Sequence, residues 1–153
     1  MSEPSATPSV TTPELVRFDV AADDQASVVA ALVDVLDQAG RLLDGEQVTA
    51  DLMAREAAGS TAIPGGVAIP HARSAGVADR TVVLLRLAAP VTWSAGAAPV
   101  DLVMGLFTPA GDSDGYLKLL SSMTKGVVGR LPREVRAAAT PDEASRVLAA
   151  AMQ

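Results

Sequence analysis

Two short apolar runs in the middle of the chain constrain its fold more than any other feature. They are TVVLLRL at residues 81–87 and VDLVMGLF at residues 100–107, both rich in β-branched and aliphatic side chains. Runs of this length and composition are typical of strands that are buried on both faces. Such strands need helices to cover them, so we expect a sheet enclosed between helical layers.

Helical patterns flank these runs on both sides. Apolar residues recur at helical spacing in residues 24–39 and 46–58, and again in segments that begin near residues 114, 132 and 141. Expected N-caps include Asp24, Asp114 and Thr140, the last in a predicted capping box with Glu143. Further short strands are expected at residues 15–20, 67–69 and 91–93. We predict an α/β fold with a mixed sheet of about five strands and helices packed on both faces.

The chain has 153 residues, which is the size of a single domain. Residues 1–13 are rich in Ser, Thr and Pro without periodicity, so we predict a flexible tail followed by one domain over residues 14–153. No apolar run approaches the roughly 18 residues of a membrane span, and the first residues lack the pattern of a secretory signal. We therefore expect a cytoplasmic protein that does not insert into the membrane.

The composition excludes much of the common chemistry. The chain has no cysteine and a single histidine, His71, so we expect no disulfide, no multi-histidine or sulfur-based metal site and no metal cofactor. Eighteen acidic residues against twelve basic ones give a formal charge of -6. Because phosphate neutralisation dominates nucleic-acid binding, this charge argues against a nucleic-acid partner.

The segment VAIPHAR at residues 67–73 holds the one candidate for catalysis. Pro70 cannot donate a hydrogen bond to a neighbouring strand, so we expect the backbone to leave regular pairing there and to place His71 at a strand end. A neutral imidazole is a good nucleophile toward phosphorus. Without further context, however, a lone histidine is more often a residue with no chemical task, and composition alone does not decide between these interpretations.

A phosphorylated imidazole needs cationic and N–H donors close by, because the product is dianionic. The local cations are Arg55, near the end of the second predicted helix, and Arg73, two residues after the histidine. Small polar residues follow Arg55 up to Thr61 and would let the backbone approach an anion. Either arginine is also compatible with an ordinary surface charge, and for Arg73 we favour that interpretation.

Taken together, these segments resemble the enzyme IIA domain of the fructose–mannitol branch of the bacterial phosphotransferase system, which includes fructose-, galactitol- and nitrogen-type members. The resemblance covers roughly residues 14–152 in matching order. It is carried by RE at residues 55–56, the small-residue stretch to Ile63, GVAIPHAR at 66–73, PVTW at 90–93, PVDLV at 99–103 and LKLL at 117–120.

The resemblance implies a phosphocarrier. In that family the histidine after Ile-Pro accepts phosphate from the phosphocarrier protein HPr and passes it to a IIB domain, which supports sugar uptake through the membrane component IIC. Carried over by position, His71 would be phosphorylated, on Nε2, and Arg55 would stabilise the phosphoryl group. No cofactor is implied.

One position departs from the family pattern. Many members have a second histidine near the phosphoacceptor, at the start of the helix that here begins near Tyr116. A tyrosine can donate a hydrogen bond to a phosphoryl oxygen but carries no positive charge. Galactitol-type relatives also lack that histidine. The departure leaves open which sugar is involved.

A regulatory role is the alternative that the resemblance leaves open. Nitrogen-type relatives keep the histidine and use its phosphorylation state to control other proteins. The Ala72-Arg73 pair after His71 is more similar to the sugar-type branch. We therefore expect a sugar-transport phosphocarrier first and a regulatory IIA protein second.

Overall fold

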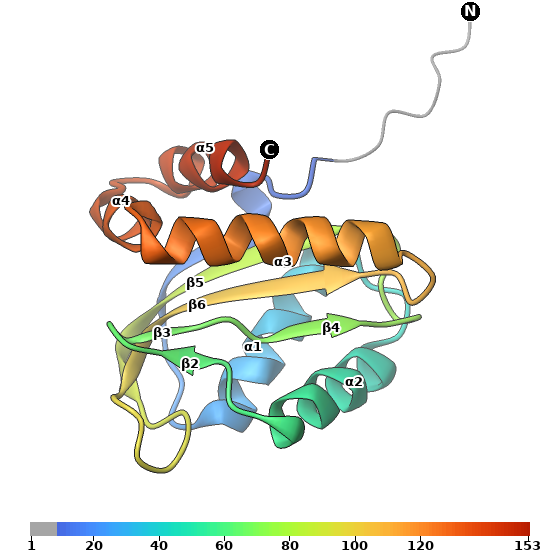
Figure 1. Cartoon of the computed structure of the whole chain (residues 1–153), viewed down its shortest axis with the longest axis horizontal. Coiled ribbons are helices and arrows are strands. Elements are labelled where there is room, and N and C mark those ends of the chain that lie inside the picture. The colour runs from blue at the N-terminus through green and yellow to red at the C-terminus, as the bar shows by residue number, and fades with distance from the viewer. Residues whose placement is uncertain (1–8) are drawn as a thin grey trace, which may run out of the picture.

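The computed structural model describes residues 9–153, which fold around a central sheet (Figure 1). No helix within that range is long and apolar enough to cross a bilayer. In chain order the elements are the 3-10 helix η1 (Pro13–Leu15), β1 (Val16–Val20), α1 (Gln25–Gln38), α2 (Gly45–Ala58), β2 (Ala62–Ile63), β3 (Val67–Ala68), β4 (His71–Arg73), β5 (Thr81–Val91), β6 (Val100–Thr108), α3 (Ser113–Val128), α4 (Leu131–Ala137) and α5 (Pro141–Ala151).

The sheet is mixed and has six strands in the order β1-β5-β6-β3-β2, with β4 also paired to β6. The two apolar runs of the sequence form its centre, where β5 and β6 pair antiparallel. Parallel pairing joins β1 to β5, and β3 and β4 to β6, whereas β2 and β3 pair antiparallel. The expectation of an α/β fold with a mixed sheet is therefore confirmed.

The sheet separates two apolar cores, one on each face. Helices α1 and α2 pack on one face, and α3, α4 and α5 pack on the other (Figure 1). Adjacent residues of β5 and β6 contribute alternately to the two cores; Phe107, for example, packs in the α1 core and Leu106 in the α3 core. Burial on both sides explains why these strands are apolar at nearly every position.

The strand count differs from the expected five because of two short strands and one absent one. Pro70 divides the predicted 67–69 segment from β4, and both pieces pair in parallel with the same strand, β6. Residues 62–63 form β2 through a turn in which Gly65 and Gly66 have φ of 97° and 78°, a region that favours glycine. The separate strand expected at residues 91–93 does not form, since Val91 is the last residue of β5.

Acidic and hydroxyl side chains cap the helices, with one correction to the predicted positions. Asp24, Asp44 and Thr140 accept hydrogen bonds from the first-turn N–H groups of α1, α2 and α5. The cap of α3 is Asp112, which accepts from the N–H of Gly115, and not Asp114. In the predicted box at Thr140, the Glu143 carboxylate accepts from the N–H of Ala139 instead of Thr140.

Within the predicted tail, the structure describes residues 9–13, and three of these contact the folded part of the chain. The carbonyl of Ser9 accepts a 2.7 Å hydrogen bond from the Arg41 guanidinium, and that of Val10 accepts one from the N–H of Val82 in β5. Thr11 is buried. The rest of the tail prediction concerns residues 1–8, which lie outside the described residues.

Candidate active site

His71 is the first residue of β4, directly after the interruption at Pro70. The pairing with β6 continues across the proline because the Pro70 carbonyl accepts a 3.0 Å hydrogen bond from the N–H of Leu106. His71 is opposite Leu106 in the register, and only 5% of its surface is exposed. The pairing with β6 thus fixes the position of the imidazole, which is almost fully shielded from solvent and lies next to the C-terminal end of α2.

Both ring nitrogens of His71 have hydrogen-bond partners. Nδ1 lies 2.7 Å from the carbonyl oxygen of Ile69, and Nε2 lies 3.2 Å from Nε of Arg55. A carbonyl can only accept and a guanidinium can only donate, so both bonds form together when the proton is on Nδ1 and the lone pair is on Nε2. The geometry therefore selects the neutral tautomer whose Nε2 is the nucleophilic nitrogen.

The surroundings also favour the neutral ring. Burial lowers the pKa of His71 below its usual value of 6.5; the hydrogen bond to Ile69 opposes this shift, the Arg55 cation adds to it and the Glu56 anion opposes it. Desolvation has the largest effect. The imidazole consequently stays unprotonated, and thus nucleophilic, to lower pH than an exposed histidine.

Arg55 is in the last turn of α2, where a cation also interacts favourably with the helix C-terminus. Its Nη1 donates a 2.9 Å hydrogen bond to the carbonyl of Gly59, while its Nε faces His71. The guanidinium is therefore oriented from two sides. The structure brings together the two residues that the sequence singled out first.

Glu56 was missed by the sequence analysis as a site residue. The residue is only 7% exposed, and its carboxylate accepts hydrogen bonds from the N–H and hydroxyl of Thr61 and, at 3.3 Å, from Nε1 of Trp93. A glutamate near a helix end is normally exposed, so nothing in the sequence except its place beside Arg55 pointed to Glu56 as a site residue. Its burial depends on a loop far along the chain that carries Trp93.

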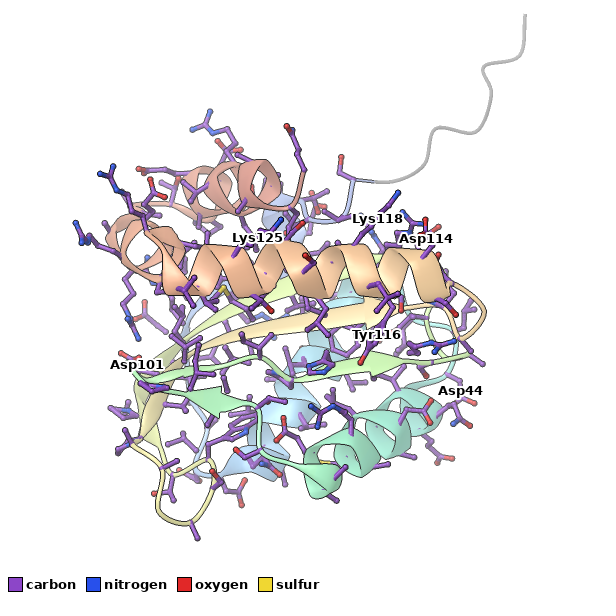
Figure 2. All side chains as sticks on the ribbon, in the orientation of Figure 1. Asp44, Asp101, Asp114, Tyr116, Lys118 and Lys125 are labelled. Carbon is purple, nitrogen blue, oxygen red and sulfur yellow. The ribbon has the colours of Figure 1, made fainter. Side chains whose placement is uncertain are left out.

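Tyr116 of α3 is the aromatic neighbour of the imidazole. It extends from the first turns of α3 toward the sheet edge that holds β4 (Figure 2), and its ring centroid is 5.8 Å from that of His71 at an interplanar angle of 45°. Arg73 contacts the same ring, with its guanidinium carbon 5.8 Å from the centroid, and donates hydrogen bonds to the carbonyl of Ala110 and to Oγ of Ser113. Arg73 therefore links β4 to the segment that leads into the first residue of α3.

No set of side chains in residues 9–153 has the grouping of His, Cys, Asp and Glu that a metal ion needs.

Comparison with known proteins identifies the family of this chain. The family described as phosphoenolpyruvate-dependent sugar phosphotransferase system, EIIA 2, matches residues 9–150. The chain is 33% identical over 136 residues to a multiphosphoryl transfer protein of Rhodobacter capsulatus, covering 87% of this chain and 16% of that protein. The chain spans between 16% and 51% of the length of the first curated relatives that it matches.

Solved structures agree with this fold. The nitrogen regulatory protein IIA-Ntr of Neisseria meningitidis has a TM-score of 0.80 and 25% identity, over 91% of this chain and 96% of that one. The mannitol IIA in its complex with phosphorylated IIB from Escherichia coli has a TM-score of 0.72 at 17% identity, over 90% and 95% of the two chains, and shows the fold alone. The chain belongs to the EIIA type 2 family of the phosphoenolpyruvate-dependent sugar phosphotransferase system, which places it among the phosphoryl-transfer components of that system.

Proposed function

We propose that the protein is a phosphohistidine carrier that accepts a phosphoryl group from HPr on Nε2 of His71 and passes it to a IIB domain for coupled sugar uptake and phosphorylation. The observation that carries this proposal is the pair of hydrogen bonds at the ring, from Nδ1 to Ile69 and from Arg55 to Nε2. They leave Nε2 as the unprotonated nitrogen, which is the nitrogen that the family resemblance implies.

The transfer needs no base and no metal in this scheme. The Nε2 lone pair attacks the phosphorus of the donor phosphoimidazole in line, so that the donor N–P bond breaks as the new one forms. The proton on Nδ1 remains there throughout, held by the Ile69 carbonyl at 2.7 Å. The donor reacts with its own second ring nitrogen protonated, so that it leaves as a neutral imidazole when its N–P bond breaks. Because donor and acceptor bonds are alike, the reaction is readily reversible, as a carrier requires.

Arg55 has to move during this reaction. In the resting site its Nε–H occupies the lone pair that attacks phosphorus, so the guanidinium must swing aside before the phosphoryl group can approach. It can then donate to the phosphoryl oxygens, as guanidinium groups do in other phosphate sites. In a chain with a formal charge of -6, this cation matters all the more.

Tyr116 and Arg73 complete the proposed site on the α3 side. Tyr116 is half-buried, and its hydroxyl is available to donate to a phosphoryl oxygen. Arg73 contributes a positive charge next to the Tyr116 ring. Both protein partners would dock over this edge, since each has to reach His71 and brief encounters need modest contact areas. The Escherichia coli complex of mannitol IIA with phosphorylated IIB supports a IIB partner by fold analogy.

A regulatory IIA protein, whose phosphorylation state controls partner proteins, is the second candidate. The similarity to the nitrogen regulatory protein of Neisseria meningitidis, at a TM-score of 0.80, favours it. Both candidates use the same chemistry at His71 and differ in what happens to the phosphoryl group afterwards.

Incubation with phosphoenolpyruvate, enzyme I and HPr tests the shared step. We expect an acid-labile phosphate on the wild type and none on His71→Ala, while Arg146→Ala, an exposed change on α5, should label normally. Absence of label on the folded wild type would refute both candidates. When labelled protein is chased with a candidate IIB domain, transfer supports the transport role and retention supports the regulatory one.

A further inference from the structure

The carboxylate of Glu56 is buried beside the site without touching the reacting ring. It accepts from the N–H of Thr61 at 3.1 Å, from the Thr61 hydroxyl and from Nε1 of Trp93 at 3.3 Å. A buried carboxylate is costly unless it is fully hydrogen-bonded, so an unneeded one would be expected to be replaced by an apolar residue. Packing alone therefore does not explain why a charged residue occupies this buried position.

One reason is a chain of hydrogen bonds that leads from Glu56 to Nδ1 of the imidazole. The carboxylate fixes Thr61, whose carbonyl accepts a 3.2 Å hydrogen bond from the N–H of Ile69. The carbonyl of Ile69 in turn accepts from Nδ1 of His71 at 2.7 Å. Hydrogen bonds in such a series polarise one another, and each fixes the position of the next. The end of the series is the bond that selects the tautomer.

A second connection leads from Glu56 to Arg55. The backbone carbonyl of Glu56 accepts from the N–H of Gly59 at 3.1 Å, and its side chain holds Thr61, so the short turn between them is fixed at both ends. The carbonyl of Gly59 is the group that orients Nη1 of Arg55. Glu56 thus supports the groups that hold each of the two ring nitrogens.

We propose that Glu56 is a positioning residue that, through Thr61, sets the Nδ1–H tautomer of His71 and orients Arg55 toward Nε2. Its role in labelling rests on the proposed phosphocarrier function, whereas its role in the tautomer does not. The charge of Glu56 has a separate effect, because it partly offsets the lowering of the His71 pKa by burial and by Arg55. The other group beside the imidazole is Tyr116, contributed by α3, and the guanidinium of Arg73, contributed by β4, lies over the Tyr116 ring.

The single histidine makes the tautomer directly measurable in the unphosphorylated protein. Long-range proton–nitrogen NMR spectra of the full chain contain one imidazole, and we expect the wild type to show a protonated Nδ1 and an unprotonated Nε2. In Glu56→Ala the three donors lose their acceptor, and we expect a mixture of both tautomers. Glu46→Ala removes the same charge from the exposed first turn of α2 and should leave the spectrum unchanged.

Glu56→Gln separates position from charge. The amide oxygen can accept from the N–H of Thr61 and from Trp93, and the amide nitrogen can donate to the Thr61 hydroxyl after it rotates. We therefore expect this variant to keep the wild-type tautomer while the pKa of His71 falls, since the anion that raised it is gone. A role in folding alone would not move the tautomer in one variant and the pKa in the other.

Labelling by HPr gives the functional measure. We expect Glu56→Ala to slow labelling by about ten- to a hundredfold, the usual cost of misplacing a reacting group, and Glu56→Gln to stay close to wild type. If Glu56→Ala does not fold, Thr61→Val removes the hydroxyl alone and should shift the tautomer in the same direction, with Thr61→Ser restoring it.

A folded Glu56→Ala variant that retains the Nδ1–H tautomer and the wild-type labelling rate would overturn the proposal, and so would a folded Thr61→Val variant that retains both if Glu56→Ala does not fold. A wild type that takes no label would refute the phosphocarrier function instead, and the nitrogen spectra would still decide the role of Glu56.

Discussion

The two sides of the imidazole are built in different ways. What we call the α2 side consists of the hydrogen-bond partners of the two ring nitrogens, the Ile69 carbonyl and Arg55 of α2, together with the buried Glu56 carboxylate that holds Thr61. On the α3 side the neighbour is an aromatic ring, Tyr116, at 5.8 Å between centroids, which contacts the imidazole without a hydrogen bond to it. One side controls the nitrogen atoms, and the other forms a wall beside them.

This difference indicates where the sequence can change without loss of the chemistry. A hydrogen bond to a ring nitrogen determines which atom is the nucleophile, so the α2 side has little freedom. A wall needs mainly the right size and shape, so a tyrosine can stand on the α3 side where the family resemblance led us to expect a histidine. The comparison predicts large effects for changes on the α2 side and small ones for changes on the α3 side.

The largest effect is expected for Arg55→Gln. The variant removes the charge that would stabilise the transferred phosphoryl group, and we expect labelling by HPr to slow by about a hundredfold or more, as for the loss of a donor to a developing anion. It also removes a cation that lowers the pKa of His71, so this pKa should rise toward 6.5 and the pH profile of labelling should shift upward.

The matched comparison for this variant is Arg55→Lys, which keeps the charge but loses the fork that reaches both Nε2 and the Gly59 carbonyl. We expect an intermediate rate from initial-rate labelling, with little change in the pKa of His71 by NMR titration. Equal rates for the lysine and glutamine variants would show that geometry, not charge, is what Arg55 supplies.

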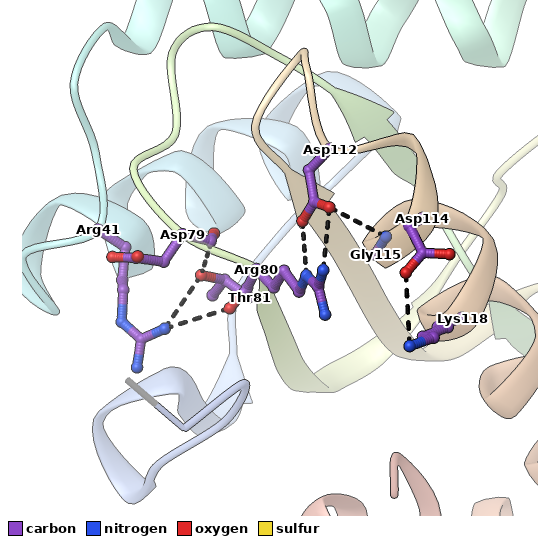
Figure 3. Close-up of polar contacts among 8 residues, drawn as sticks. All are labelled: Arg41, Asp79, Arg80, Thr81, Asp112, Asp114, Gly115 and Lys118. Carbon is purple, nitrogen blue, oxygen red and sulfur yellow. Dashed lines mark hydrogen bonds and ion pairs between the residues drawn. The ribbon is translucent and has the colours of Figure 1, made fainter. Parts of the chain in front are cut away.

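A smaller effect is expected from the support of the α3 side. Asp112 caps α3 and forms a bidentate pair with Arg80, as Figure 3 shows, whereas Asp114 contacts only Lys118, at 3.4 Å. Asp112→Ala should lower the melting temperature by about 2–4 °C and increase amide exchange in the first turn of α3. Labelling should change little, because the nitrogen atoms of His71 are held from the other side.

Asp114→Ala is the control, since it removes an exposed carboxylate two residues away in the same turn. It should leave the melting temperature and the exchange pattern near those of the wild type. If Asp112→Ala slowed labelling as strongly as Arg55→Gln, the α3 side would be more than a wall.

The sequence predicted the parts of the site that depend on local pattern. The interruption at Pro70 and the resemblance through residues 66–73 identified His71, and the neighbouring helix end identified Arg55. Central strands β5 and β6 were recognisable because burial on both faces leaves a continuous apolar run. Both features can be read within about ten residues of chain.

Features that depend on distant segments were not predicted. The burial of Glu56 requires Trp93, 37 residues further along the chain, to close over it. The correct cap of α3 was missed because two aspartates precede the apolar pattern, and the bidentate contact of Arg80, 32 residues earlier, distinguishes Asp112. Strand β4 is only three residues long and exists through its pairing with β6, so propensity alone does not reveal it.

The smallest effect is expected for Tyr116→Phe, which keeps the ring against His71 and removes only the hydroxyl. Tyr116 is only half-buried, so water can replace its hydroxyl as a donor to the phosphoryl oxygen, and labelling should stay within about threefold of wild type. Tyr116→His should also label, at an altered rate, because it restores a nitrogen donor on that side without disturbing Arg55 or the Ile69 carbonyl. Initial rates of labelling at one HPr concentration, measured beside Arg55→Gln, test the contrast directly. A tenfold or greater loss in Tyr116→Phe would mean that the hydroxyl holds the phosphoryl group during transfer, and the asymmetry between the two sides of the ring would then be wrong.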